Sequence, residues 1–194
     1  MKKYLVIGNP ISHSLSPKIH NYWIKKNNID AIYDKKKIND NELADIIFDV
    51  KQQIISGVNV TVPFKNTVIP YLDELSEESK ITQSVNTIYL KNSKVIGYNT
   101  DIEGFVNAIK KMNFNFNNKK IFILGAGGVV PSIVYGSMKM GSSEVMISNR
   151  TKENAYKIKN IFNNIKLIEW GEIPDFDVII NATSLGSVSY THLT

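Results

Sequence analysis

A short apolar stretch followed by a glycine-rich turn restricts the fold of this chain more than any other feature. The stretch is IFIL at residues 121–124, the turn is Gly125-Ala126-Gly127-Gly128, and a helical pattern then continues to Lys139. A strand, a tight glycine turn and a helix in this order are typical of a doubly wound sheet. Gly125 suits the sharp turn, and Gly127 lets a ligand approach the backbone. The turn therefore predicts a parallel α/β domain with an anion site at the start of the helix.

Further strands and one helix are expected after this turn. The segments EVMISNR, IKLIEW and DVIINATS contain the strands, and residues 151–162 form the helix. The strands are nearly uninterrupted apolar runs, as in sheets that are buried on both faces. Val130 occupies a position where the usual dinucleotide-binding pattern has Gly or Ala, and Pro131 fits the first helical turn. The sequence predicts a Rossmann-like domain over residues 119–194.

The first hundred residues have a different α/β pattern. Apolar stretches that predict strands are YLVIG, AIYDKKKI, GVNVTVP and SVNTIYL, and helices are expected at residues 17–26 and 41–53. We therefore expect a separate α/β domain over residues 1–100.

A helix and a polar stretch are expected between these two domains. Residues 101–112 have apolar side chains at helical spacing, with Thr100 or Asp101 as the N-cap. The asparagine-rich stretch 113–118 is interpreted as a polar exit from this helix. Residues 101–118 are therefore predicted to be a connecting helix and linker.

The composition excludes several classes of protein. The chain has 194 residues, 43% of them hydrophobic and 21% charged, and no apolar run reaches the ~20 residues that a membrane helix needs. It has no cysteine, which fits a reducing compartment, and we expect a cytoplasmic protein. The net charge of +5 comes from dispersed lysines without a nucleic-acid module. A small anionic partner is therefore favoured over nucleic acid.

The segment ISNRTKEN contains the only arginine of the chain, Arg150, against 22 lysines. Its planar guanidinium binds phosphate with a geometry that an ammonium does not match. Arg150 lies about 25 residues beyond Gly125, where a carboxylate would hold the ribose 2′-hydroxyl of NAD. Residues 149–152 contain no carboxylate and instead offer donors and positive charge: Asn149, Arg150, Thr151 and Lys152. They predict NADP as the cofactor, with a chance arginine on a solvated loop as the alternative.

Two serines precede the first expected helix, in NPISHSLSPKIHN. Ser14 and Ser16 are two residues apart, so their hydroxyls point to one side of an extended segment. Paired hydroxyls suit a carboxylate, and Pro17 fits the start of a helix whose amides favour the same anion. An N-cap at Ser16, with Ser14 merely exposed, explains the pattern equally well. His13 and His20 have no partner pattern and are interpreted as structural.

Seven motifs occur in the order found in shikimate dehydrogenases: NPISHSLSPKIHN, NVTVPFK, VNT, GYNTD, LGAGG, SNRT and NATSLG. The chain resembles this family over residues 4–186. The resemblance implies an N-terminal α/β substrate domain, a Rossmann-like NADP-binding domain and an active site between them. It implies the reversible, NADP-dependent reduction of 3-dehydroshikimate to shikimate in the shikimate pathway. It also implies a monomer or homodimer that acts on a small molecule without metal, membrane or nucleic acid.

The resemblance further implies roles for individual residues. Catalysis falls to Lys65 and Asp101, and substrate binding to Ser14, Ser16, Thr61, Asn86 and Asp101. Cofactor binding falls to Gly125, Ala126, Gly127, Gly128, Asn149, Arg150, Thr151, Lys152 and Thr183. A lysine suits the chemistry, because hydride addition to a carbonyl leaves an alkoxide that needs a proton. A carboxylate favours the charged form of a lysine, so Asp101 is expected to orient Lys65 and the substrate.

The resemblance ends at Ser187. The family pattern has methionine after NATSLG, and relatives continue through further strands and a C-terminal helix. We therefore expect a truncated reading frame with an unrelated tail from about Ser187. A quinate/shikimate dehydrogenase of broader specificity and an inactive ligand-binding remnant stay open as alternatives. Asn154 stands where relatives often carry a basic residue, which weakens the expected preference for NADP.

Overall fold

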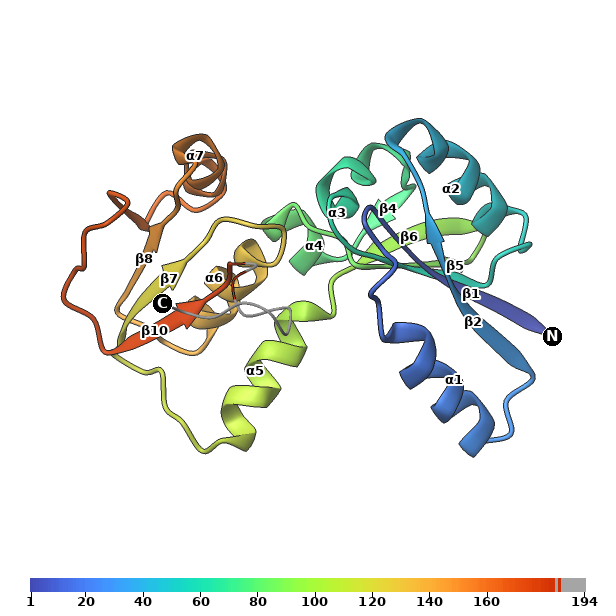
Figure 1. Ribbon diagram of the computed structural model, residues 1–194, viewed down its shortest axis with the longest axis horizontal. Coiled ribbons are helices and arrows are strands. Elements are labelled where there is room, and N and C mark those ends of the chain that lie inside the picture. The colour runs from blue at the N-terminus through green and yellow to red at the C-terminus, as the bar shows by residue number, and fades with distance from the viewer. Residues whose placement is uncertain (184, 186–194) are drawn as a thin grey trace. The chain divides into compact units, whose positions relative to one another are not determined.

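The computed structural model describes residues 1–183 and residue 185. The chain divides into two compact units, Met1–Thr100 and Asp101–Thr194 (Figure 1). Both units combine parallel strands with helices, so the predicted α/β class is confirmed. None of the helices in the described part of the chain has the length and apolar character needed to cross a bilayer. The expected tail from Ser187 lies outside the described residues.

Unit 1 is built on a six-stranded mixed sheet with the order β2-β1-β3-β5-β6-β4. Its strands are β1 (Lys2–Gly8), β2 (Ala31–Lys37), β3 (Gly57–Val60), β4 (Glu74–Leu75), β5 (Thr87–Lys91) and β6 (Lys94–Tyr98). β1 is parallel to β2 and β3, whereas β5 is antiparallel to β3 and β6. The carboxyl ends of β1 and β3 therefore lie at the same sheet edge as the start of β5 and the end of β6.

The helices of unit 1 lie on both sides of this sheet, with α1 and α2 on opposite sides (Figure 1). They are α1 (Ser16–Lys26), η1 (Asp40–Glu42), α2 (Leu43–Lys51), α3 (Phe64–Thr67), η2 (Ile69–Tyr71) and α4 (Glu77–Thr82). The helix expected over 41–53 is shorter in the structure. A reciprocal capping box between Asn39 and Glu42 starts the 3₁₀ turn η1, and Gln53 ends the segment with a positive φ of 60°.

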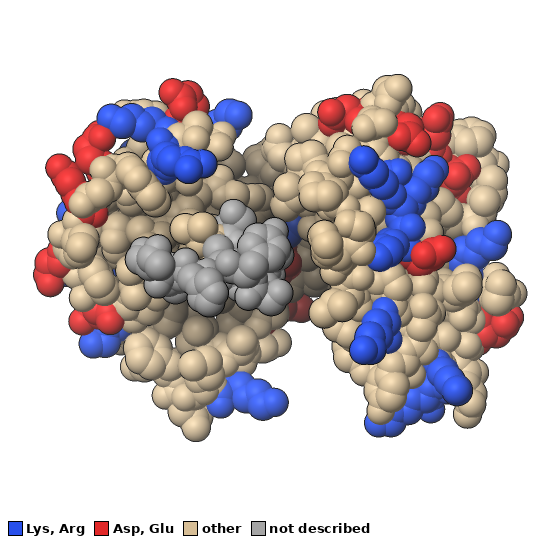
Figure 2. Space-filling view, in the orientation of Figure 1, with Lys and Arg blue, Asp and Glu red and all other residues tan. Residues whose placement is uncertain are grey.

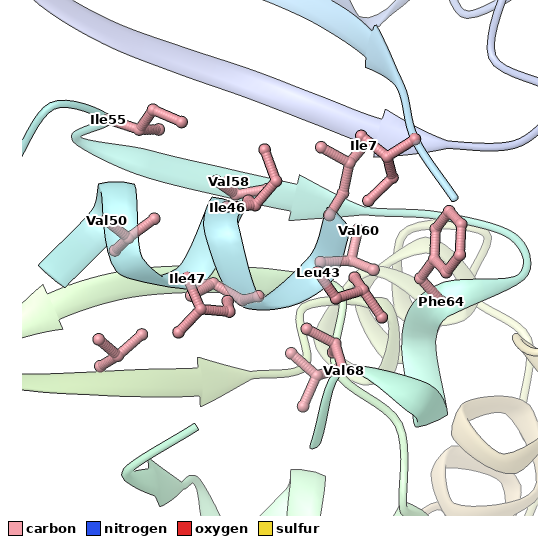
Figure 3. Close-up of a cluster of buried hydrophobic side chains, with 14 residues drawn as sticks. Ile7, Leu43, Ile46, Ile47, Val50, Ile55, Val58, Val60, Phe64 and Val68 are labelled. Carbon is pink, nitrogen blue, oxygen red and sulfur yellow. The ribbon is translucent and has the colours of Figure 1, made fainter. Parts of the chain in front are cut away.

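The core of unit 1 lies between α2 and the sheet (Figure 3). Leu43, Ile46, Ile47 and Val50 follow helical spacing and are all buried. They pack in one cluster with strand residues such as Val58. Burial of each of these side chains contributes about 1.5–3 kcal/mol. The α2 side of the sheet is thus a rigid support for the loops at its edge.

Unit 2 contains a four-stranded, fully parallel sheet with the order β10-β7-β8-β9. The strands are β7 (Lys120–Leu124), β8 (Glu144–Ser148), β9 (Lys166–Ile168) and β10 (Val178–Asn181). The helices are α5 (Asp101–Lys111), α6 (Val130–Lys139) and α7 (Lys152–Ile161). This is the predicted strand and helix alternation. On the face shown in Figure 2, the cationic side chains of each unit are interspersed with acidic ones.

The stretch predicted to be a polar linker packs into unit 2. Phe116 is 2% exposed, and its ring lies 5.9 Å from that of Phe105 on α5 in an edge-to-face arrangement. Gly136 on α6 also lies against this helix, since a Cβ there would come within 2.8 Å of the Phe105 ring. Residues 101–118 therefore belong to unit 2, and Phe105, Ile109 and Phe116 pack into its core. Of the two residues expected as the N-cap of this helix, Asp101 is the first residue of α5 and Thr100 is the residue before it.

Candidate functional site

Asn86 is a buried polar residue at the edge of the unit 1 sheet. Its Oδ1 accepts three hydrogen bonds: from the Thr100 N–H (2.9 Å), the Thr100 hydroxyl (3.1 Å) and the Thr87 hydroxyl (3.0 Å). These donors fix the orientation of the amide, because a reversed amide would set its NH₂ group against them. The orientation of the Asn86 amide is therefore fixed, and its NH₂ group is the part that can donate to a ligand.

A second asparagine, Asn59 in β3, supports this arrangement. Its Nδ2 donates to the Asn86 carbonyl (3.2 Å) and to the Thr87 hydroxyl (3.1 Å), and its Oδ1 accepts from the Tyr33 hydroxyl at 2.7 Å. Burial raises the pKa of Tyr33 to about 12, so this hydroxyl keeps its proton. The sequence analysis did not identify Asn59, Tyr33 or Thr87 as site residues. The available signal was a polar residue between buried valines in GVNV.

Thr61 and Lys65 lie on the turn that joins β3 to α3. The Thr61 N–H donates to the Ile7 carbonyl in β1 (2.9 Å), and the Thr61 carbonyl accepts from the Phe64 N–H (3.0 Å). Phe64 is 1% exposed and anchors this turn in the core. Lys65 follows it as a half-buried side chain, and its carbonyl accepts from the Val85 N–H at 2.8 Å. The core thus sets the position of the backbone that carries Lys65.

Ser14 and Ser16 lie in the loop after β1 and at the start of α1. The helix begins at Ser16 and its N-cap is Leu15, so an N-cap role for Ser16 is wrong. The Ser14 hydroxyl instead accepts from the Ser16 N–H at 3.3 Å, and Pro17 occupies the first turn. Both serines are half-buried. The two hydroxyls therefore lie at the N-terminal end of α1, where the helix dipole favours an anion.

One sheet edge collects these side chains. The Ser14 loop follows β1, Thr61 follows β3, and the Val60 N–H donates to the Asn86 carbonyl at 2.8 Å. Thr100 follows β6 at the same edge, and Asp101 comes next as the first residue of α5 in unit 2. Residues with hydroxyl, amide and ammonium side chains therefore follow the strand ends at one edge of unit 1, and such groups suit a small polar ligand.

In unit 2, Gly125 makes the turn after β7. Its φ is +108°, and a Cβ there would lie 2.8 Å from the Ala182 carbonyl oxygen, so the turn accepts glycine alone. Gly127 faces open space, where a Cβ would meet nothing within 4 Å. Gly128 and the start of the ten-residue helix α6 follow. Such a turn lets a diphosphate approach the helix N-terminal amides. Val130, at the position usually held by Gly or Ala, is fully buried in the core of unit 2.

The residues after β8 differ in how their side chains are engaged. The Asn149 Nδ2 donates to the Thr151 carbonyl at 2.8 Å. Lys152 forms an ion pair with Glu169 at 2.6 Å, which the sequence analysis did not predict. Arg150 is exposed, and within the described residues its guanidinium has no ion pair or hydrogen bond. The uncompensated cation at this position is therefore Arg150.

Thr183 lies beside the glycine turn. It follows β10, the neighbour of β7, and its hydroxyl donates to Asn181 Oδ1 at 2.7 Å. The Thr183 N–H group lies 3.1 Å from the point that a Cβ of Gly125 would occupy. The glycine turn, the free guanidinium of Arg150 and the lack of a carboxylate in residues 149–152 fit NADP. No cluster of potential metal ligands occurs among the residues that the structure describes.

Comparison with known proteins identifies the family. A family model of the shikimate dehydrogenase substrate binding domain matches residues 6–88, and a model of shikimate / quinate 5-dehydrogenase matches residues 107–190. The second match extends past Ser187, where the sequence analysis placed the end of the resemblance.

Curated relatives are similar over nearly the whole chain. A protein of Pelagibacter ubique named shikimate dehydrogenase (NADP(+)) is 55% identical over 185 residues, which cover 95% of this chain and 70% of that protein. A protein of the same name from Caldicellulosiruptor bescii is 37% identical over 193 residues, with 96% and 67% covered.

Solved structures share the fold. Shikimate dehydrogenase from Aquifex aeolicus is 36% identical with a TM-score of 0.87, covering 99% of this chain and 72% of that one. Shikimate 5-dehydrogenase from Thermus thermophilus, in complex with NADP(H) and shikimate, is 27% identical with a TM-score of 0.84, covering 96% and 70%. The chain belongs to the shikimate dehydrogenase family.

Proposed function

We propose that this protein catalyses the reversible, NADP-dependent reduction of 3-dehydroshikimate to shikimate. Unit 1 (residues 1–100) is the substrate-binding domain and residues 119–194 form the NADP-binding domain, to which residues 101–118, packed on unit 2, are the connection. Membership of the shikimate dehydrogenase family supports this function, as do the Pelagibacter ubique relative's name and the NADP(H) and shikimate in the Thermus thermophilus structure. The proposal also places the enzyme in the cytoplasm, as a monomer or homodimer.

The edge of the unit 1 sheet binds the substrate in this proposal. Ser14 and Ser16 hold its carboxylate, because their two hydroxyls lie together at the N-terminal end of α1, where the helix dipole favours an anion. Thr61, Asn86 and Asp101 bind the ring hydroxyls. The NH₂ group of Asn86 is the donor, since its Oδ1 is occupied by Thr100 and Thr87.

Lys65 and Asp101 carry the proton chemistry. NADPH, when bound, supplies the hydride. The carbonyl oxygen of 3-dehydroshikimate gains negative charge as the hydride adds, and the Lys65 ammonium donates the proton that turns it into a hydroxyl. In the reverse direction neutral Lys65 takes that proton back. Asp101 orients Lys65 and the substrate, because a carboxylate can accept hydrogen bonds from an ammonium group and from a ring hydroxyl.

The cofactor-binding residues lie along the strand ends of unit 2. The turn of Gly125, Ala126, Gly127 and Gly128 receives the diphosphate against α6, and Thr183 lies beside it. The 2′-phosphate is bound by Asn149, Arg150, Thr151 and Lys152. Arg150 makes the main contribution, because its guanidinium can form two parallel hydrogen bonds to a phosphate.

The observation that supports this proposal most is the arrangement of Ser14, Thr61, Lys65 and Asn86 along one sheet edge of a family member. The test is shikimate-dependent formation of NADPH by the purified chain. We expect the parent chain to form NADPH from shikimate and NADP. The Lys65→Met variant should lose this activity. A folded protein that binds NADPH and shikimate without turnover would instead support the ligand-binding remnant.

Quinate is the second substrate to compare, because one matching family model describes shikimate / quinate dehydrogenases. The ratio of kcat/KM for shikimate to that for quinate, measured with NADP and again with NAD, separates the two functions. A ratio well above one with NADP supports the proposed function. A ratio near one with either cofactor supports the enzyme of broader specificity.

A further inference from the structure

The strand ends of the unit 2 sheet place the acidic residue Glu169 beside the proposed cofactor site. β7, β8 and β9 are parallel neighbours, so their carboxyl ends lie at one edge. The glycine turn follows β7, residues 149–152 follow β8, and Glu169 follows β9. The Ser148 hydroxyl at the end of β8 donates to the Glu169 carbonyl at 3.3 Å. Glu169 is thus fixed next to the residues proposed for the 2′-phosphate.

The carboxylate of Glu169 is paired with one of those residues. Its Oε2 lies 2.6 Å from Nζ of Lys152, and the two side chains are 59% and 58% exposed. The hydrogen bond from Lys152 to Glu169 and the charge of Glu169 raise the pKa of Lys152, so this lysine stays charged. A ligand that binds Lys152 therefore also meets the negative charge of Glu169. Asn154, two residues further along α7, is uncharged and does not offset it.

We propose that Glu169 is a specificity-determining residue that acts through Lys152 and limits the preference for NADP over NAD. A 2′-phosphate carries about −1.5 to −2 charges near neutral pH, so a carboxylate that occupies Lys152 both competes with it and repels it. NAD has a hydroxyl at that position and does not experience this repulsion. The inference rests on the proposed function of the same site.

Removal of the Glu169 charge should change the binding of one cofactor only. In Glu169→Gln we expect the Kd of NADPH to fall about 3- to 10-fold, because an exposed ion pair is partly screened by solvent. The Kd of NADH should change less than about 2-fold. The gain should shrink as salt is raised from low to physiological concentration. Fluorescence titration with NADPH and with NADH measures both constants without turnover.

A double-mutant cycle shows whether the effect passes through Lys152, and a charge control shows whether it is specific. In a Lys152→Gln background, Glu169→Gln should no longer lower the Kd of NADPH. Asp175→Asn is the matched charge control. Asp175 pairs with Lys120 at the same distance of 2.6 Å, but at the amino end of β7. It should leave both Kd values unchanged.

The outcomes separate this inference from the proposed function. If Glu169→Gln leaves the ratio of the Kd of NADPH to that of NADH unchanged, and the chain still prefers NADPH, the role of Glu169 is overturned but the proposed function is not. Weaker NADH binding in that variant also overturns it, because Glu169 would then be a ligand of the ribose hydroxyls. A parent chain that binds neither nucleotide removes both the inference and the NADP-dependent function.

Discussion

Oδ1 of Asn86 accepts both the backbone N–H and the side-chain hydroxyl of Thr100, at 2.9 and 3.1 Å. The residue that ends unit 1 thus holds the side chain proposed to bind a ring hydroxyl of the substrate. Thr87 and Asn59 complete the network. The amide of Asn86 is ordered before any ligand binds, so little conformational entropy is lost on binding.

Thr100→Val should weaken shikimate binding, because it removes one of the three donors to Asn86 Oδ1 while keeping the shape of the side chain. A lost hydrogen bond of about 1 kcal/mol corresponds to a rise of about 3- to 10-fold in the Kd of shikimate. Thr100→Ser retains the hydroxyl and should bind like the parent chain. Calorimetric titration with shikimate measures the difference, and equal affinity of the valine variant contradicts this role of Thr100.

Lys65→Met should reduce kcat about 100- to 10 000-fold, because the variant lacks the proton donor for the developing alkoxide. The fold should survive, since the contact of residue 65 with the Val85 N–H uses the backbone carbonyl. The Kd of shikimate should change only a few-fold. Rapid single-turnover measurements of NADPH formation test this directly, and an unchanged rate removes Lys65 from the mechanism.

Gly125→Ala and Gly127→Ala should separate the fold from the cofactor site. At Gly125 the positive φ and the close Ala182 carbonyl make alanine strained, so we expect a loss of about 1–3 kcal/mol in the free energy of unfolding. At Gly127 an added methyl group meets no protein atom within 4 Å, so stability should be retained. Denaturant unfolding measures both effects.

NADPH titration of the same two proteins gives the second half of this test. The Gly127 methyl group would stand where the diphosphate is proposed to approach, so Gly127→Ala should bind NADPH at least about 10-fold more weakly. Unchanged NADPH binding in a stable Gly127→Ala protein would place the diphosphate elsewhere.

Tyr33 gives a prediction for alkaline pH. Its pKa is raised from 10.0 to about 12 by burial, so the folded state retains a proton that the unfolded state loses. The contribution of the retained Tyr33 proton to the free energy of unfolding is complete below pH 10. It disappears as the pH rises to about 12, with a total of roughly 2–3 kcal/mol. Tyr33→Phe cannot show this loss. Urea unfolding of both proteins from pH 9 to pH 12 tests it, and parallel pH profiles would contradict the shift.

The sequence predicted the parts of the fold that depend on local pattern. The glycine turn after β7 and the helix that ends at Lys139 are present as expected, because strand, turn and helix signals were adjacent in the chain. The strand β6 was not predicted. It pairs with β5 through a turn at Asn92 and Ser93, both with positive φ, and serine at the second position gave no turn signal.

Contacts between distant residues explain what else was missed. Phe116 lies in an asparagine-rich stretch, so composition suggested a linker, yet its ring is buried against Phe105. The pair of Lys152 and Glu169 joins the segments that follow β8 and β9, and it has no sequence signature. Asn59 was passed over for the same reason, because its partners Tyr33 and Thr87 become neighbours only when the sheet forms.

The binding of NADPH and NADH to Arg150→Gln tests the central claim most directly. The claim is that this family member uses NADP through the guanidinium of Arg150, which forms no ion pair within the part of the chain that the structure describes. We expect the Kd of NADPH to rise about 10- to 100-fold, as for the loss of a charged hydrogen-bonding group, while the Kd of NADH stays within about 2-fold of its parent value. Equal changes in the two constants, or no change in either, would contradict the account.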